Sequence, residues 1–193
     1  MTTEDARNQF LIEMYKAMWD NVNRHIGVIW SSVTVLFGAF AALGLVEKNV
    51  LPIDLAVALV VTVSMWHLGH IYDASYWVNR NLLIVRNIER QFLTKRDVRE
   101  IHYYFGREPR QDKMIEHFRV QFSLGISVPI LMLLYHFSKR GMPGSRTAEE
   151  LFKLAPYAIL VVGLILVAIL RHKHKTSYQR LRENSPGREI QND

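Results

Sequence analysis

The chain of 193 residues contains no cysteine. It therefore cannot be a small secreted protein that depends on disulfide bonds for its stability. Charge is also missing from long parts of the chain, because no Asp, Glu, Lys or Arg occurs in residues 26–46, 55–72, 120–138 and 154–170. The near-zero mean hydropathy of +0.01 is thus the average of apolar, charge-free stretches and strongly charged stretches. These charge-free stretches largely exclude a soluble domain with a single core.

The common catalytic motifs are absent as well. The sequence has no Gly-rich phosphate loop, no His-Glu-x-x-His and no Gly-x-Ser-x-Gly. His172 and His174 flank Lys173 without an acidic or thiol ligand nearby, so we interpret them as surface charge. We predict no enzymatic activity, no cofactor and no metal site.

The four charge-free runs are typical of membrane-spanning helices. Each has 17 to 21 residues, the length of a helix that crosses a hydrocarbon core of about 30 Å. The first run begins after 25 polar residues and is too long for the core of a signal peptide, which favours a retained anchor. We expect an all-α, polytopic membrane protein with four transmembrane helices embedded in the lipid bilayer.

The distribution of Lys and Arg predicts the orientation. Nineteen of these residues lie in 1–25, 73–119 and 171–193, and five lie in the two remaining loops. By the positive-inside rule, both termini and the long central stretch are cytoplasmic. The expected localisation is the inner (cytoplasmic) membrane, with multiple passes.

We therefore divide the chain into five segments. Residues 1–25 form a cytoplasmic amphipathic helix, 26–72 form transmembrane helices 1 and 2, and 73–119 form a cytoplasmic helical hairpin. Transmembrane helices 3 and 4 occupy 120–170, and a basic cytoplasmic tail occupies 171–193.

Two apolar stripes support the helical cytoplasmic part. A stripe at helical spacing predicts that the second span continues to about residues 92–101, and its members are Val78, Leu82, Val85, Ile88 and Phe92. A second stripe in the amino segment either packs against the hairpin or lies at the membrane surface; its members are Leu11, Met14, Met18 and Val22.

The third and fourth spans differ in composition. The third contains Gln121, Ser123, Ser127 and a central Pro129, which is expected to kink the helix. The fourth is the most uniformly apolar, with Pro156 near its first turn, and is expected to face lipid.

A small subunit with a projecting hairpin leaves apolar surface that it cannot bury alone. We expect a homo-oligomer with closed symmetry, and a tetramer is favoured. The alternative is a monomer in which the amino segment alone covers the hairpin.

Polar residues in the first two spans are the candidates for a pore or gate. The first span supplies hydroxyl groups, and the lower part of the second supplies a stripe of ionisable groups, because polar groups within membranes are functional candidates. The candidates are Ser31, Ser32, Thr34, His67, His70 and Asp73. The alternative is that the second group only reaches the lipid headgroups.

Three arginines are the candidates for binding an anionic ligand. Arg86 and Arg90 stand one helical turn apart, with Arg80 to one side. Like charges at this spacing repel slightly, so the pair is better explained by carboxylates or by a phosphate, which suits the planar guanidinium. The alternative is pairing within the chain to Glu89, Asp97 or Glu100. Residues 103–105 (Tyr-Tyr-Phe) are expected either to stack on nucleotide bases or to pack at the membrane interface.

Four short spans, both ends inside and a basic helical hairpin with Arg80, Arg86 and Arg90 resemble a known group of proteins. These are the small multipass effectors of nucleotide-signalling anti-phage defence systems, and the Hailong-type channel subunit is the nearest in layout. The resemblance covers the layout of the whole chain, and no site is transferred by position. It implies an oligomeric channel, used in antiviral defence, that a nucleotide or oligonucleotide ligand controls.

Three functions compete on these grounds. The first is a homo-oligomeric channel that an anionic ligand at the basic cytoplasmic helices gates or holds closed. The second is a non-conducting membrane scaffold that recruits a soluble partner protein through the basic hairpin. A small transporter is disfavoured, since the spans hold no charged pair and show no inverted repeat.

Overall fold

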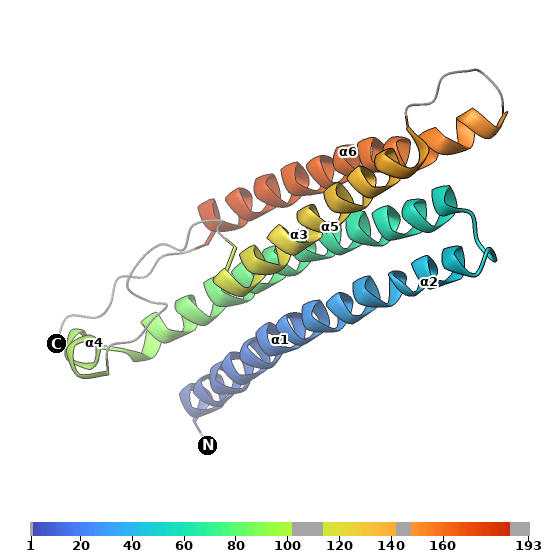
Figure 1. Cartoon of the computed structure of the whole chain (residues 1–193). Coiled ribbons are helices and arrows are strands. Elements are labelled where there is room, and N and C mark those ends of the chain that lie inside the picture. Colours follow the sequence, from blue (N-terminus) through green and yellow to red (C-terminus); the bar gives the residue numbers. More distant parts are fainter. Residues whose placement is uncertain (1, 102–113, 142–147, 186–193) are drawn as a thin grey trace. The chain divides into compact units, whose positions relative to one another are not determined.

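The computed structural model describes residues 2–101, 114–141 and 148–185 (Figure 1). The described part is all-helical, with 91% of it in helices and no strand. The helices are α1 (Thr3–Ala39), α2 (Ala41–Glu47), α3 (Ile53–Phe92), α4 (Lys95–Ile101), α5 (Glu116–Arg140) and α6 (Ala148–Glu183). Four candidate spans are long and apolar enough to cross a membrane and contain the four charge-free runs, as predicted: Thr3–Glu47, Ile53–Phe92, Glu116–Arg140 and Glu150–Glu183. The first was expected to be one helix, but a turn at Phe40 divides it into α1 and α2.

Local sequence sets where several helices begin. At the start of α1 the Thr2 N–H donates to Asp5 Oδ2 at 2.8 Å, and the Asp5 N–H donates to Thr2 Oγ1 at 3.1 Å. Thr94 and Asp97 form the same reciprocal pair before α4. Such pairs satisfy amide groups that the first helical turn leaves without partners. The backbone N–H and hydroxyl of Thr94 hold the pKa of the Asp97 carboxyl below its usual value.

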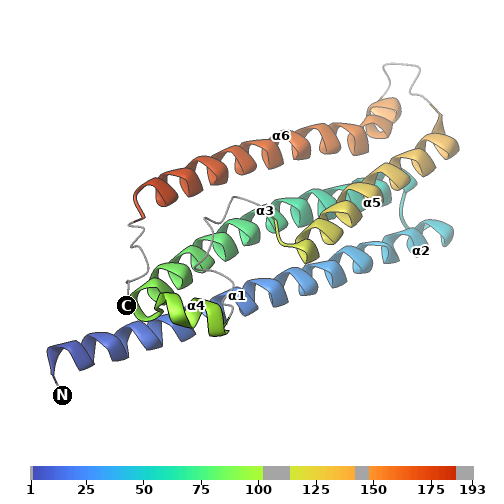
Figure 2. The same cartoon turned by 90° about the vertical axis from the view of Figure 1, so that its left-hand side faces the viewer.

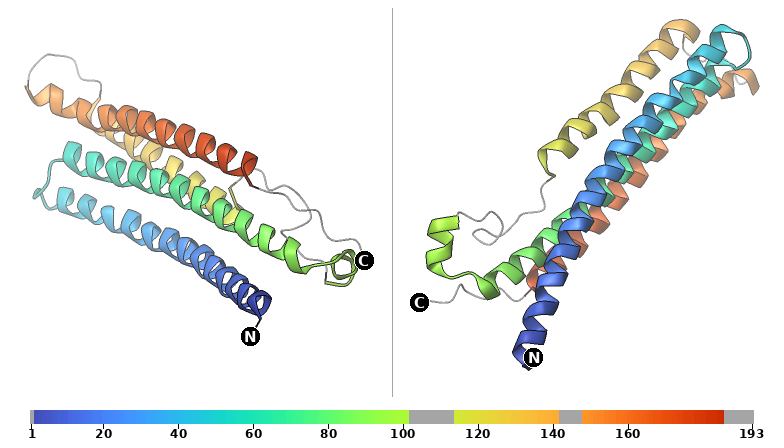
Figure 3. Two further views of the ribbon diagram at one scale, coloured as in Figure 1. Left: turned by 180° about the vertical axis from the view of Figure 1, so that it is seen from behind. Right: turned by 90° about the horizontal axis from the view of Figure 1, so that it is seen from below.

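The second span continues without interruption past the charge-free run. Helix α3 ends at Phe92, at the near end of the predicted range. Figure 3 shows α4 as a short separate helix after α3. The predicted turn and much of the second limb of the hairpin lie in 102–113, outside the described residues, so the hairpin itself stays a prediction.

The structure places Pro129 where it was expected, but not Pro156. Pro129 lies inside α5, as expected for the third span. Pro156 was expected near the first turn of the fourth helix, but α6 begins at Ala148 and Pro156 is internal. The expectation was wrong because the polar residues before the charge-free run are also helical. At its other end α6 continues to Glu183, so much of the predicted tail is helical.

The chain divides into two compact units, which we name by composition. The charged unit comprises Met1–Gly27, Ala74–Lys113 and Lys173–Asp193. The apolar unit comprises Val28–Asp73 and Met114–His172, and it holds most of each charge-free run.

Within the charged unit, the amino-terminal half of α1 packs against the second half of α3. Arg7 donates to Gln91, the Tyr15 hydroxyl donates to Glu89 Oε1 at 3.3 Å, and the His25 ring stacks on Trp77. Both predicted stripes contribute buried residues, namely Leu11, Val22, Val78, Leu82, Val85 and Ile88, whereas Phe92 is exposed. The amino segment was expected either to pack against the hairpin or to lie at the membrane surface. In the structure it packs on the continuation of the second span.

Within the apolar unit, α3 lies between α1 and α6, and α5 packs alongside it (Figure 2). Two glycines permit close contacts to α3. A Cβ at Gly125 would lie 2.8 Å from Leu68 Cδ2, and a Cβ at Gly163 would lie 2.3 Å from Met65 Cγ. Helix α6 is the least covered, since 11% of its apolar window is buried against 56% for α3. This exposure agrees with the lipid-facing role predicted for the fourth span.

Candidate functional site

A buried histidine and serine link the first two spans. Ser32 Oγ lies 2.7 Å from the Ile29 carbonyl oxygen and 2.8 Å from His67 Nδ1. His67 also forms a hydrogen bond with the backbone of Gln121 on α5, so the imidazole links α3 to both α1 and α5. His67 has no exposed surface, and Ser32 is 3% exposed.

One edge of this imidazole faces α5. A Cβ at Gly125 would lie 3.2 Å from His67 Cδ2, the carbon bonded to Nε2. Gln121, one helical turn before Gly125, is 3% exposed. Both polar atoms of its side-chain amide are buried without a hydrogen-bond partner among the described residues. Leaving a buried amide unsatisfied is costly, so this place is a candidate for a functional site.

A second polar cluster lies at the start of α3. His136 Nε2 lies 2.8 Å from Asp54 Oδ1, and Arg140 Nη2 donates to Asp54 Oδ2 at 2.7 Å. The other nitrogen of the imidazole, His136 Nδ1, lies 3.2 Å from the Tyr157 hydroxyl oxygen. Asp54 thus bridges His136 and Arg140, and the Arg140 guanidinium compensates the charge of the buried carboxylate.

Sequence reasoning missed this second cluster. Asp54 was placed in an outer loop, and His136 and Arg140 were not singled out. A signal was present, because His136 and Arg140 stand four residues apart at the end of the third span, and Asp54 directly precedes the second. The sequence does not give the relative rotation of the helices, and this rotation decides whether these side chains meet.

An apolar core separates the two polar clusters. Asp54 and His67 are thirteen residues apart on α3, which is about 20 Å along a helix. Between them Val57, Val60 and Val61 have no exposed surface and pack with residues of α1 and α5. Within the described residues of one subunit, polar groups therefore form no continuous track through the apolar unit.

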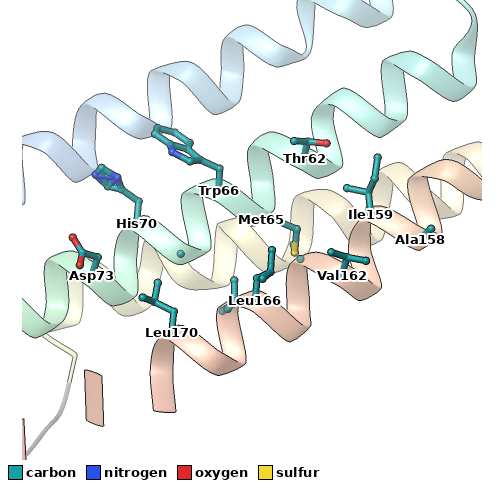
Figure 4. Close-up of a pocket in the computed structure, with 13 residues that line it drawn as sticks. Thr62, Met65, Trp66, His70, Asp73, Ala158, Ile159, Val162, Leu166 and Leu170 are labelled. Atoms are coloured by element: carbon teal, nitrogen blue, oxygen red, sulfur yellow. The ribbon is translucent and has the colours of Figure 1, made fainter. Parts of the chain in front are cut away.

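The six predicted pore or gate residues lie in three places. Ser32 and His67 form the buried pair described above. His70 and Asp73 line a groove between α3 and α6 (Figure 4). Ser31 and Thr34 lie on the exposed side of α1. The structure thus joins one pair and separates the others.

The three predicted ligand-binding arginines lie on α3 in the charged unit. Arg86 is buried, with 8% of its surface exposed, and Arg90 is about 40° further around the helix. Asn79, which is 1% exposed, lies on the same side as Arg86. Arg80 lies about 120° from Arg86, and its guanidinium is 5.2 Å from the centroid of the Trp77 ring. Residues 103–105 lie outside the described residues.

Within the described ranges, no group of three or more His, Cys, Asp or Glu side chains is arranged to hold a metal ion. His172 is exposed, but His174 is not surface charge as interpreted above, because it is half-buried and stacks on Tyr76 with ring centroids 4.7 Å apart. The prediction for His174 was wrong because the carboxyl-terminal segment continues as a packed helix.

Comparisons with protein-family models, with curated proteins and with solved structures find no match for this chain. The functional conclusion therefore rests on the chemistry of the residues themselves.

Proposed function

We propose that this protein forms a homo-oligomeric ion channel whose water-filled path lies between subunits. Both termini would be cytoplasmic, and an anionic nucleotide or oligonucleotide at the basic cytoplasmic helices would gate the channel or hold it closed. One observation carries the proposal. Hydroxyl side chains point outward from helices that are long and apolar enough to cross a membrane, while the subunit interior is sealed by apolar residues.

The outward-facing hydroxyls occur on two helices. On α1, Ser31 and Thr34 are exposed, and a Cβ added at nearby Gly38 would meet nothing within 4 Å. On α5, Ser123 and Ser127 are exposed one turn apart, with their hydroxyls donating to carbonyls of the same helix. A hydroxyl that donates within its own helix still has an oxygen that can accept a hydrogen bond, and a hydrated path or a neighbouring helix can supply the donor whereas lipid cannot. Small residues beside hydroxyls also allow close approach of another helix.

The sealed interior supports a path between subunits over one through each subunit. The buried residues between the two polar clusters are mostly Val, Leu, Met and Ala side chains, and the hydroxyl of the buried Ser64 donates to the Val60 carbonyl of its own helix. Ions need polar walls or a wide hydrated opening, and close-packed aliphatic side chains provide neither. An assembly of several copies would bring the α1 or α5 hydroxyls together around an axis.

The proposed ligand follows from the arginines on α3. Arg86 and Arg90 lie on neighbouring sides of the helix, and their guanidinium groups match the geometry of phosphate oxygens. The Arg80 guanidinium lies over the Trp77 ring, 5.2 Å from its centroid, on another side of the helix. In an oligomer each arginine recurs in every subunit, which multiplies the positive charge available to a polyanion.

The absence of native cysteine makes a decisive experiment simple. The protein is reconstituted in vesicles, and ion flux is measured for Ser31→Cys and Thr34→Cys before and after a charged thiol-modifying reagent. We expect modification to change the flux, because a thiol in a hydrated path ionises and reacts. Ile165→Cys is the matched control. Its side chain is 54% exposed on α6, and a thiol surrounded by hydrocarbon should stay unreactive.

The proposal is overturned if the vesicles show no flux under any ligand or voltage condition. Retained binding of a soluble partner protein in that case would favour the membrane scaffold. Flux that responds to Ile165→Cys and not to either α1 variant would place the conducting path elsewhere.

A further inference from the structure

A groove of about 730 Å³ runs between α3 and α6 within the apolar unit. Its α6 wall is aliphatic and includes Val162, Leu166 and Leu170 (Figure 4). On the α3 side, the hydroxyl of Thr62 donates to the Ala58 carbonyl at 2.8 Å, which leaves the groove apolar at that end. Polar side chains gather at the opposite end of the groove, where His70 and Asp73 lie.

Two glycines line the groove and differ in how closely the helices approach there. Met65 already fills the crossing at Gly163, where an added Cβ would overlap it. At Gly69, by contrast, an added Cβ would lie 3.8 Å from Leu170 Cδ2, which is an ordinary contact distance. A larger side chain at Gly69 would therefore extend into the groove.

We propose that this groove binds one acyl chain of a membrane phospholipid, with the headgroup at the Asp73 end. The groove extends from Ala158 to Leu170 along α6, which is about 18 Å of helix. That length is close to half of the roughly 30 Å hydrocarbon core, the depth that one acyl chain occupies. The proposal does not depend on ion conduction.

The charges at the polar end match a zwitterionic headgroup. Asp73 ends the α3 side of the groove, and Arg171 directly follows Leu170 on α6, with its guanidinium 5.9 Å from the Tyr72 ring centroid. With an arginine and a carboxylate at the same end of the groove, the guanidinium can receive the phosphate and the carboxylate the amine of phosphatidylethanolamine. The aromatic Trp66 and Tyr72 are of the kind that collects near headgroups.

Quenching of Trp66 fluorescence tests the proposal in the full-length protein. Trp66 is made the sole tryptophan by Trp19→Phe, Trp30→Phe and Trp77→Phe. The protein in dodecyl maltoside micelles is titrated with phosphatidylethanolamine that carries bromine on its acyl chains. We expect quenching that saturates at a low mole fraction of this lipid.

Variants that fill the groove separate a site from general contact with lipid. Gly69→Leu should raise the half-saturating mole fraction at least tenfold, and Ala158→Leu, which narrows the other end, should raise it in the same direction. Gly44→Leu is the matched control, because a Cβ at Gly44 meets nothing within 4 Å and Gly44 is not part of the groove. Arg171→Gln should weaken binding by about tenfold or more, the worth of one charge-assisted hydrogen bond.

Three results would overturn the inference. Linear, non-saturating quenching that is equal in wild type and both filled variants would mean contact with bulk lipid only. No quenching in the wild type would mean that protein, such as a second copy, covers the groove. Unchanged affinity in Arg171→Gln would refute the headgroup assignment.

Discussion

Replacing Gly163 with alanine should destabilise the apolar unit through its contact with Met65. An ideal Cβ at Gly163 would lie 2.3 Å from Met65 Cγ, 2.9 Å from Sδ and 2.7 Å from Cβ. Rotation of the methionine side chain can move Cγ and Sδ away. It cannot move Met65 Cβ, which the backbone of α3 holds in place. To restore a carbon–carbon contact of about 3.5 Å, α3 and α6 must separate by about 0.8 Å.

A matched glycine in the same groove isolates this cost. Gly69→Ala places its Cβ 3.8 Å from Leu170 Cδ2 and needs no rearrangement. Both substitutions gain the same helix propensity of about 1 kcal/mol, so the propensity cancels when the two variants are compared. The remaining difference is the overpacking cost of about 1–3 kcal/mol, with Gly163→Ala the less stable.

The assay is reversible unfolding of the two variants by SDS in mixed micelles, followed by far-ultraviolet circular dichroism. The reasoning is refuted if the two free energies of unfolding agree within about 0.5 kcal/mol, or if Gly163→Ala is the more stable. Met65→Ala in the Gly163→Ala background should restore only part of the loss, because the Cβ of residue 65 remains.

Two further predictions concern charge. Asp54→Asn should lower the free energy of unfolding by about 2–3 kcal/mol, less than for a fully buried pair because the Arg140 side chain is 33% exposed. Glu116→Gln, which removes an exposed ion pair with Arg119, should change it by less than about 1 kcal/mol in the same denaturation assay; equal effects would contradict the assignment. Arg90→Glu should abolish co-purification of an anionic ligand in native mass spectrometry while the oligomer stays intact. Unchanged ligand binding would remove Arg90 from the site.

The spans and the apolar stripes could be predicted because they are local properties of the chain. A charge-free run of about twenty residues has one stable arrangement in lipid, the helix, which satisfies its own backbone. The spacing of Val78, Leu82, Val85 and Ile88 likewise defines one face of a helix, and that face is buried. The helix ends at Ala148 and beyond residue 171 were misjudged, because polar sequence continues as helix there, and the turn at Phe40 within the first span was not predicted.

The polar clusters could not be predicted to the same degree, because they join residues far apart in the chain. Ser32 meets His67 across 35 residues, and Asp54 meets His136 across 82. Which residues meet depends on the rotation and the axial position of each helix, which small residues such as Gly125 and Gly163 permit and their neighbours fix.

The sequence alone therefore determined that this chain is an all-helical protein with four candidate spans, since hydrophobicity and helical period act over a few turns. Only the tertiary structure decided that Ser32 and His67 are buried together and that Ser31 and Thr34 face outward. It also decided that a groove lies between α3 and α6. These features depend on how helices distant in sequence pack, and close packing selects one arrangement among many that the same pattern allows.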